Sequence, residues 1–425
     1  MSSNINILAA HPFCGQETIP GDKSISQRAI IFAALAQGQT RLSHFLKSED
    51  CLHTLEALKN LGLNFTWHIN GDLLIEGLGL KGFKAPSAPL YFGNSGTGFR
   101  LMAGVLAAQP FDSVLTGDAS LCKRPMNRIT EPLKQMGAKI TGSVAPLKIT
   151  GNQNLVGIDY KLLIASAQVK SCILLAGQFA KGVTRVYETH ATRDHSERLL
   201  KIFNTDGILK GQNLIIPGDI SSASFFIVAA LLIPGSHLFL KSVGVNPTRL
   251  GVIRILKLMG ANIELGNQTD DWEPTADIIV QYSTLRGISI PLEEVVSAID
   301  EFPILFIAAA FAQGNTLLRG AAELRVKESD RLAKMAQNLK QLGVQLEEYP
   351  DGMNIKGDLD ININHNKEII IDAAGDHRIA MAFCIAGCIL KNKGYNASFI
   401  VQDTDCIKTS FPNFIDLLKK FSNLL

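Results

Sequence analysis

The chain has 425 residues, which exceeds the usual size of a single hydrophobic core and therefore favours two domains. Hydrophobic residues make up 46% of it and charged residues 19%, as in an ordinary globular protein. A net charge of +2 argues against broad electrostatic binding to nucleic acid, and no apolar run approaches the roughly 20 residues of a membrane span.

The N-terminal stretch MSSNINILAAHPF lacks the basic start and the long apolar segment of a signal peptide. Seven cysteines are present and none forms a C-x-x-C pair, so free thiols are favoured over disulfides or zinc. Cys384 and Cys388 lie one helical turn apart in an apolar segment, which favours core packing. The nine histidines form no metal-binding motif. We therefore expect a soluble cytoplasmic protein.

Six apolar helices are predicted along the chain, and each is followed by a stop residue and a strand. Their apolar segments start, in chain order, at Arg28, Thr97, Gln168, Ser222, Glu301 and His377. Because these helices are apolar nearly all round, each should be buried. A left-handed helix-ending position suits Gly38, Gly182, Gly235, Gly314 and Gly394.

A second series of predicted helices is amphipathic and alternates with the first. LEALKNLGLNF, which ends at Phe65, recurs in segments that end at Ile140, Ile263 and Leu346. Each has lysine near its end and a glycine before the next strand. Together the two series predict a mixed α/β protein with six units of strand, buried helix, strand, outer helix, strand and strand. Their spacing of roughly 55 to 80 residues exceeds that of common solenoid repeats.

Six units could form one array or two globules, and the size limit on a single core favours two globules of three units. A boundary within residues 238–249 divides the predicted buried helices unevenly. The division becomes even if residues 1–20 return to the C-terminal globule and the chain crosses between the globules inside a unit. We therefore expect one domain of residues 1–20 and 241–425, a second domain of residues 21–240, and an active site in the cleft between them.

Polar segments stand at the starts of all six buried helices and are candidates for anion binding. They are GDKSISQR (21–28), GNSGTGFR (93–100), SAQVKS (166–171), GDISSAS (218–224), IDEF (299–302) and GDHR (375–378). Each helix N-terminus carries about +0.5 of effective charge, so six pointing into one cleft would sum to roughly +3. Ser, Asp, Asn and Gly are also ordinary helix caps. Capping alone does not explain the cations that recur there, which are Lys23, Arg28, Arg100, Lys170 and Arg378.

Nucleotide-binding motifs are not supported by the sequence. The chain contains no Gly-Lys dipeptide, so GDKSISQR cannot be a phosphate loop of the G-x-x-x-x-G-K-[ST] type. GLGLKG (77–82) matches G-x-G-x-x-G, but Pro86 and Pro89 follow where a helix should begin.

Three further segments carry many charges: CKRPMNR (122–128), THATRDHSER (189–198) and ELRVKESDRLAKM (323–335). On a helix, Lys327 and Arg331 would share one face, with Glu328 beside Arg331. A solvated salt-bridge face is an equal alternative, although cations near a helix N-terminus favour an anionic ligand.

Asp300 and Glu328 are candidates for general acid/base work, which needs a tuned group beside the reacting atoms. Asp300 lies between two apolar stretches, where burial could raise its pKa. It could instead cap the following helix, and Glu301 is an adjacent competitor for either role.

GDKSISQR, GNSGTGFR, KRPM, RVKESDR, GDHR and KTSFP, in this order, resemble the signature segments of the 5-enolpyruvylshikimate-3-phosphate synthase family. The resemblance covers essentially the whole chain. It implies a two-domain inside-out α/β barrel with three βαβαββ units in each domain and two crossovers between domains. It also implies transfer of the enolpyruvyl group of phosphoenolpyruvate to the 5-hydroxyl of shikimate 3-phosphate, with release of phosphate. The two substrates carry roughly five to six negative charges, which suits clustered arginines and lysines.

Carried over by motif, the resemblance implies three groups of site residues. The catalytic residues would be Asp300, Glu328 and Lys23. Shikimate 3-phosphate would contact Lys23, Ser24, Arg28, Ser166, Gln168, Arg193, Asp300 and Lys327. Phosphoenolpyruvate would contact Lys23, Asn94, Gly96, Arg124, Gln168, Arg331, Arg378 and Lys408. Asp300 would take the 5-hydroxyl proton, Glu328 or Lys23 would protonate the methylene carbon, and a tetrahedral intermediate would lose phosphate. We expect a monomer without cofactors.

The chain departs from the family pattern at two places. Ala167 stands where many members have a second serine. Lys408 matches a different branch of the family from SAQVKS and TRDHSER. Gly96 predicts inhibition by glyphosate, because tolerant members often have alanine there and a Cβ would intrude on the anion site.

Two rival functions differ from this expectation. An enolpyruvyl transferase acting on UDP-N-acetylglucosamine uses a loop cysteine as its acid, whereas Cys122 adjoins KRPM. A non-catalytic anion-binding protein would not need Asp300, Glu328 and Lys23 together.

Overall fold

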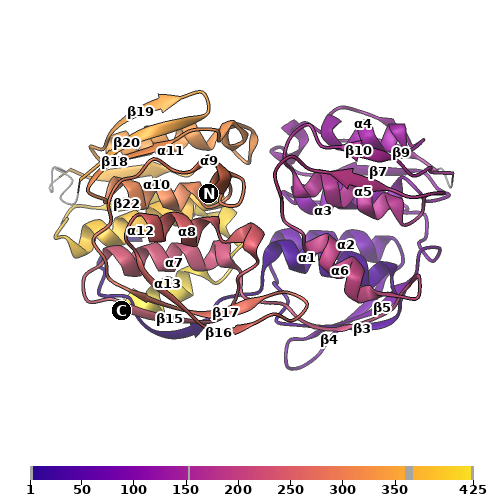
Figure 1. Cartoon of the computed structure of the whole chain (residues 1–425), viewed down its shortest axis with the longest axis horizontal. Helices are drawn as coiled ribbons and strands as arrows, with labels where there is room; N and C mark the ends of the chain where they lie inside the picture. Colours follow the sequence, from indigo (N-terminus) through magenta and orange to yellow (C-terminus); the bar gives the residue numbers. More distant parts are fainter. Residues whose placement is uncertain (1–2, 152–153, 359–366, 423–425) are drawn as a thin grey trace. The chain divides into compact units, whose positions relative to one another are not determined.

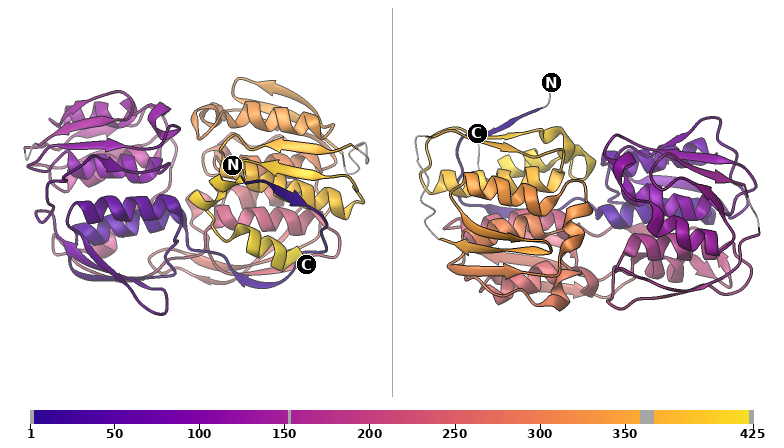
Figure 2. Two further views of the ribbon diagram at one scale, coloured as in Figure 1. Left: turned by 180° about the vertical axis from the view of Figure 1, so that it is seen from behind. Right: turned by 90° about the horizontal axis from the view of Figure 1, so that it is seen from above.

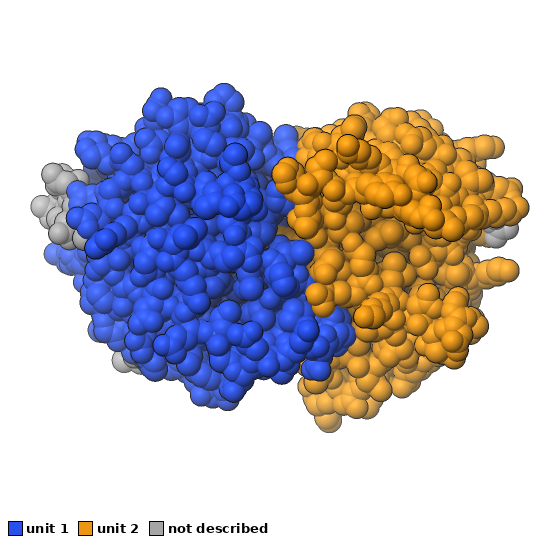
Figure 3. All heavy atoms as spheres, viewed as in Figure 1, with its two compact units in different colours: residues 1–20, 217–425 blue, residues 21–216 orange. Residues whose placement is uncertain are grey.

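The computed structural model describes residues 3–151, 154–358 and 367–422. The chain divides into two compact units, shown in separate colours in Figure 3. Unit 1 contains Met1–Pro20 and Pro217–Leu425, and unit 2 contains Gly21–Ile216. The chain therefore returns from unit 2 to unit 1 after Ile216, which is earlier than the expected boundary at 240/241. The reason is that α7 (Ile220–Leu232) and β15 (His237–Gly244) pack with elements of unit 1.

Unit 2 begins with a four-stranded sheet in the order β14-β3-β5-β4. Its strands are β3 (Gln37–Ser43), β4 (Asn64–Trp67), β5 (Leu73–Leu78) and β14 (Asn213–Ile215). β14 is parallel to β3, and the other neighbours are antiparallel. The helices of this part are α1 (Lys23–Leu35) and α2 (Glu49–Asn60).

A second sheet of unit 2 repeats this pattern in the order β6-β7-β9-β8. Its strands are β6 (Leu90–Tyr91), β7 (Ser113–Thr116), β8 (Lys139–Thr141) and β9 (Leu147–Thr150), and its helices are α3 (Gly96–Leu106), η1 (Leu121–Lys123) and α4 (Asn127–Gln135). Two small sheets pair β10 (Asp159–Lys161) with β11 (Arg185–Tyr187) and β12 (Asn204–Thr205) with β13 (Ile208–Leu209). Their helices are α5 (Ala167–Gly177) and α6 (His195–Phe203).

Unit 1 contains three sheets, in the orders β16-β17-β15-β2, β18-β20-β19 and β1-β22-β21. The strands not yet given are β1 (Ile5–Ile7), β2 (Cys14–Thr18), β16 (Asn262–Thr269), β17 (Thr275–Gln281), β18 (Gly314–Leu318), β19 (Gln345–Tyr349), β20 (Gly352–Gly357), β21 (Ile369–Asp372) and β22 (Phe399–Gln402). The chain's two ends meet here, because β1 pairs with β22. In Figure 2 the indigo N-terminal segment lies beside the yellow elements.

The helices of unit 1 include three buried ones: α7, α10 (Phe302–Ala310) and α12 (His377–Asn392). The others are η2 (Pro247–Arg249), α8 (Gly251–Leu258), α9 (Leu292–Val295), η3 (Ala322–Val326), α11 (Arg331–Gln341), η4 (Thr404–Thr409) and α13 (Phe414–Ser422). Figure 1 labels α7 to α13. Sheets with antiparallel and parallel pairs among many helices confirm the predicted mixed α/β class.

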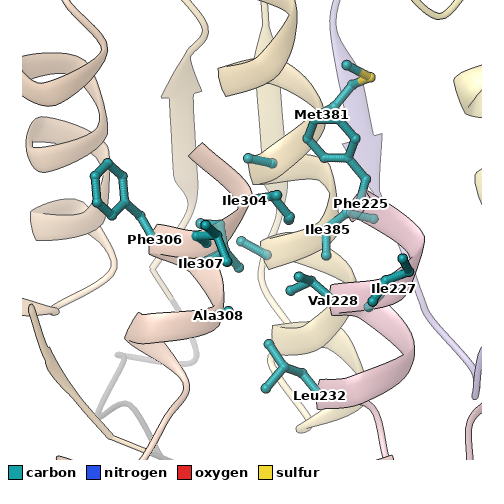
Figure 4. Packing of buried hydrophobic residues seen from close by; sticks show 14 of the residues in the cluster. Phe225, Ile227, Val228, Leu232, Ile304, Phe306, Ile307, Ala308, Met381 and Ile385 are labelled. Carbon is teal, nitrogen blue, oxygen red and sulfur yellow. The ribbon is translucent and has the colours of Figure 1, made fainter. Parts of the chain in front are cut away.

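Burial of the apolar helices is confirmed. Every residue of α7 and α10 is buried, because neither helix has a polar face to present to water. Figure 4 shows side chains such as Val228, Ile304 and Ile385 from α7, α10 and α12 packed together in one cluster. Consequently only the ends of these helices can offer polar groups to a ligand.

The predicted helix-ending glycines are confirmed in backbone conformation but not all in position. Gly38, Gly182, Gly235, Gly314 and Gly394 all have φ between 79° and 93°. That left-handed backbone favours glycine. Only Gly394 directly follows a helix C-cap, whereas Gly38 and Gly314 lie within β3 and β18.

All seven cysteines are free thiols, as expected, and Cys384 and Cys388 are buried in α12. Burial raises the pKa of the Cys388 thiol to about 12, which makes it unreactive. Among the described helices none is long and apolar enough to cross a membrane.

Candidate active site

The first turn of α1 places Lys23 and Ser24 at a helix N-terminus. Asp22 caps the helix, because its carboxylate accepts a hydrogen bond from the Ile25 N–H at 2.8 Å. Lys23 Nζ lies 3.1 Å from Asp50 Oδ2, and both side chains are largely buried. The Lys23 ammonium is thus held at the end of α1 by a carboxylate from α2. Asp50 was not among the predicted site residues.

Arg28 connects three helices of unit 2. Its Nε and Nη2 donate to Ser196 Oγ in α6 and Ser171 Oγ in α5, at 3.0 and 3.1 Å. Its Nη1 donates to the Ser24 carbonyl at 3.0 Å. Arg28 is only 2% exposed, and its hydrogen bonds hold α1, α5 and α6 together. Its direct contact with a substrate stays a prediction.

Arg193 reaches the same helix end from the segment before α6. Its Nη1 donates to Ser24 Oγ at 3.2 Å. Ser166 caps α5, where its Oγ accepts from the Val169 N–H at 3.4 Å. The structure therefore brings Lys23, Ser24, Arg28 and Arg193 together around the start of α1.

Asn94 and Arg124 form a second cluster at the start of α3. Arg124 Nη2 donates to Asn94 Oδ1 at 2.5 Å, and Asn94 Nδ2 donates to Asp118 at 2.7 Å. Gly96 begins α3 between two guanidinium groups. A Cβ added to it would lie 2.9 Å from Arg100 Nη1 and 3.0 Å from Arg124 Nη1. Even one methyl group would therefore displace cationic side chains.

Gln168 joins the Gly96 cluster to α5. Its Oε1 accepts from Arg100 Nη1 at 2.7 Å, and its Nε2 donates to Thr97 Oγ1 at 2.9 Å. The amide therefore bridges α3 and α5 at their N-terminal turns, beside Ser166.

Asp300 is the centre of the predicted site residues in unit 1. Its Oδ1 lies 3.1 Å from Lys327 Nζ and 3.6 Å from Arg331 Nη1. Its backbone carbonyl accepts from Arg378 Nη1 at 2.8 Å. Its side chain is 15% exposed, so a carboxylate in contact with Lys327 and Arg331 remains reachable from solvent.

Arg331 is 1% exposed and is surrounded by carboxylates. Its Nε lies 2.8 Å from Asp376 Oδ2, and its Nη2 lies 2.6 Å from Glu328 Oε2. Burial acts to lower the pKa of Arg331, but Asp376, Glu328 and Asp300 together raise it above its ordinary value. Among the described residues, its Nη1 makes no hydrogen bond.

The expected helical face shared by Lys327 and Arg331 is wrong. Helix α11 begins at Arg331, because Asp330 caps it by accepting from the Ala333 N–H at 3.0 Å. Lys327 precedes the helix in non-helical backbone. The two cations meet through Asp300 instead, which is a contact that helix periodicity cannot predict.

Glu301 lies on the buried side of this group. Its Oε1 is 3.6 Å from Arg378 Nη1 and 3.9 Å from Arg249 Nη2, and it accepts a hydrogen bond from Ser221 Oγ. Because its side chain has no exposed surface, it supports Arg378 from behind. Of these groups, Arg249 lay outside every polar segment singled out in the sequence.

Lys408 lies in η4, and its side chain is 60% exposed. The contact described for it is with Asp405 Oδ1 at 2.8 Å, and this hydrogen bond lowers the pKa of Asp405. Among the described residues no group of three or more His, Cys, Asp and Glu could hold a metal ion.

Comparison with known proteins gives a consistent match along the chain. A family model described as EPSP synthase (3-phosphoshikimate 1-carboxyvinyltransferase) matches residues 9–418. The chain is 51% identical over 420 residues to the 3-phosphoshikimate 1-carboxyvinyltransferase of Coxiella burnetii (strain CbuG_Q212), covering 95% of this chain and 93% of that protein. It is 47% identical to the enzyme of the same name from Legionella pneumophila (strain Corby), covering 97% and 96%.

Solved structures agree with these relatives. EPSP synthase from Acinetobacter baumannii superposes with a TM-score of 0.84 at 47% identity, over 99% of this chain and 98% of that chain. The enolpyruvyl transferase NikO from Streptomyces tendae superposes with a TM-score of 0.76 at 13% identity, covering 99% and 98%, a likeness of fold alone.

Proposed function

The chain belongs to the EPSP synthase family, and we propose here which of its residues carry out the reaction of that family. It transfers the enolpyruvyl group of phosphoenolpyruvate to the 5-hydroxyl of shikimate 3-phosphate and releases phosphate. This is a step of the shikimate pathway toward chorismate and the aromatic amino acids. The observation that best supports the assignment of roles is Asp300, whose partly exposed carboxylate contacts Lys327 and Arg331 and whose backbone carbonyl accepts from Arg378.

Shikimate 3-phosphate is assigned first to the cluster at the start of α1. Lys23, Ser24 and Arg193 present an ammonium, a hydroxyl and a guanidinium at a helix N-terminus, which favours a phosphate. Arg28 holds this arrangement from its buried position. Ser166, Gln168 and Lys327 complete the proposed set, and Asp300 faces the 5-hydroxyl.

Phosphoenolpyruvate is assigned to the cluster around Gly96 and to the arginines beside Asp300. The guanidinium groups that flank Gly96 suit an anionic group close to the backbone. Arg331 Nη1 makes no hydrogen bond among the described residues and lies 3.6 Å from Asp300 Oδ1. The full proposed set is Lys23, Asn94, Gly96, Arg124, Gln168, Arg331, Arg378 and Lys408.

The proposed chemistry is an addition followed by an elimination. Asp300 accepts the 5-hydroxyl proton as the oxygen bonds to the central carbon of phosphoenolpyruvate, and Glu328 or Lys23 delivers a proton to the methylene carbon. The resulting tetrahedral intermediate then loses a methyl proton and its phosphate, which restores the double bond. The neighbouring cations stabilise the negative charge that develops on the substrates.

Several finer features follow from family membership and are part of the proposal. We propose that unit 1 and unit 2 are each an inside-out α/β barrel built from three βαβαββ repeats. We also propose that residues of unit 1 and of unit 2 act on the same pair of substrates. We further propose that the protein works as a cytoplasmic monomer and that glyphosate inhibits it.

Phosphate release from phosphoenolpyruvate tests the function directly. Purified protein should release phosphate with shikimate 3-phosphate as the acceptor and not with UDP-N-acetylglucosamine. Release only with the sugar nucleotide would favour the rival transferase. No release with either acceptor would favour a non-catalytic anion-binding protein.

A further inference from the structure

Lys170 is a buried cation that none of the proposed reaction steps uses. It lies in the first turn of α5, and its side chain is only 5% exposed. Its Nζ lies 2.8 Å from Glu188 Oε2 and 2.7 Å from Glu197 Oε1. A lysine is rarely buried unless it is paired. The two carboxylates that contact this ammonium therefore form a buried ion-pair cluster with it.

The two carboxylates flank the segment that carries Arg193. Glu188 directly follows β11, whereas Glu197 lies in the first turn of α6. Residues 188–194 between these elements form neither helix nor strand. Backbone without regular hydrogen bonding depends on side-chain contacts for a fixed position. Lys170 supplies such a contact at each end of the segment.

A third contact reaches the residue next to Arg193. The carbonyl of Thr192 accepts from Lys170 Nζ at 3.5 Å, and the hydroxyl of Thr192 donates to Glu188 Oε1. Thr192 is 6% exposed, so the backbone is anchored one residue before the guanidinium that contacts Ser24.

We propose that Lys170 is a positioning residue that fixes Arg193 for the phosphate of shikimate 3-phosphate. This inference rests on the proposed function, which assigns Arg193 to that substrate. Lys170 acts through Glu188, Glu197 and Thr192 and does not itself touch the substrate. We name these four side chains the Lys170 clamp. Loss of the clamp should weaken use of shikimate 3-phosphate more than use of phosphoenolpyruvate.

Two variants remove the clamp in different ways. Lys170→Met leaves two buried carboxylates without their shared cation and is at risk of misfolding. The triple variant Lys170→Met/Glu188→Gln/Glu197→Gln removes all three charges together and keeps similar side-chain sizes. We expect KM for shikimate 3-phosphate to rise about tenfold in each, with kcat and KM for phosphoenolpyruvate within about threefold of wild type.

Tryptic cleavage gives a second readout of the clamp. Cleavage after Arg193, identified by fragment mass, should be about tenfold faster in the triple variant, because the segment is released from its anchor. Lys59→Met is the matched control, since Lys59 lies in the same unit and pairs with Glu56 at the exposed surface. It should leave all these values unchanged.

Arg193→Ala separates failure of this inference from failure of the proposed function. If Arg193→Ala raises KM for shikimate 3-phosphate but the folded triple variant does not, the clamp is overturned and the assignment of Arg193 stands. If Arg193→Ala changes nothing, the assignment itself is overturned and the clamp has no substrate role. Faster cleavage with an unchanged KM would likewise overturn the positioning role.

Discussion

The two units differ in the oxygen atoms that the described contacts place around their site cations. In unit 2, the described contacts of Arg28, Arg124 and Arg193 are with hydroxyl, amide and backbone oxygens. In unit 1, Arg331 and Lys327 contact the carboxylates of several acidic residues. A neutral oxygen satisfies a donor without cancelling its charge, whereas a carboxylate neutralises it.

This difference suggests a division of labour. In unit 2 the proposed site residues stand at helix N-termini, which favour an anion, and we assign a substrate phosphate to them. Unit 1 holds a carboxylate, Asp300, in contact with Lys327 and Arg331, and we assign to it the acceptance of the 5-hydroxyl proton. Lys23 in unit 2 also contacts a carboxylate, that of Asp50.

The largest effect on catalysis is expected from a substitution of Lys23. Lys23→Ala should lower kcat by about a thousandfold or more and weaken binding of both substrates, because it removes a contact to each and a candidate proton donor. Steady-state kinetics and calorimetric titration measure the two effects. Unfolding of the variant, seen by circular dichroism, would instead show that the Lys23–Asp50 pair is structural.

The contrast between the units can be tested by comparing the free energies of unfolding of one variant from each unit. Arg331→Met should lower the free energy of unfolding by about 3–5 kcal/mol, because it leaves buried carboxylates without their cation. Arg28→Met should cost less, about 1–3 kcal/mol, since the acceptors described for it are two hydroxyls and a carbonyl. Urea denaturation of both variants makes the comparison. Equal losses would contradict the distinction between neutral and charged partners.

Gly96→Ala should produce a smaller and more selective effect. A Cβ within 2.9–3.0 Å of two guanidinium nitrogens narrows the anion site, so the glyphosate concentration for half inhibition should rise about tenfold. An inhibition curve at fixed substrate concentrations measures it. A wild-type enzyme that is unaffected by millimolar glyphosate would contradict the assignment.

Ser24→Ala should have the smallest effect of the series. Its hydroxyl is one neutral donor at a site rich in cations, so KM for shikimate 3-phosphate should rise only about threefold to tenfold. KM for phosphoenolpyruvate should stay unchanged, in contrast to Lys23→Ala. A larger effect on phosphoenolpyruvate would move Ser24 to the other substrate.

Local rules predicted much of this molecule. Caps such as Asp22, Ser95 and Asp376 and helix-ending glycines follow from hydrogen bonding and backbone sterics within a few residues. The apolar helices were recognisable because nothing on them needs water. The boundary at which the chain returns to unit 1 was predicted too late in the sequence, because α7 has no polar face that would indicate which core it joins.

Contacts between distant segments could not be predicted in the same way. Asp50 beside Lys23, Glu301 beside Arg249 and Glu188 beside Lys170 are brought together by packing of separate elements. Sequence spacing carries no information on such pairs. The Asp330 cap shows a local signal that was present but outweighed by charge periodicity, so α11 was expected to begin too early.

The division of labour is tested most directly by the affinity of two variants for shikimate 3-phosphate. By calorimetric titration, Arg193→Ala should raise Kd about tenfold or more, whereas Asp300→Asn should keep Kd within about fivefold while kcat falls by about 10²–10⁴. A large loss of affinity in Asp300→Asn with normal binding by Arg193→Ala would contradict the account.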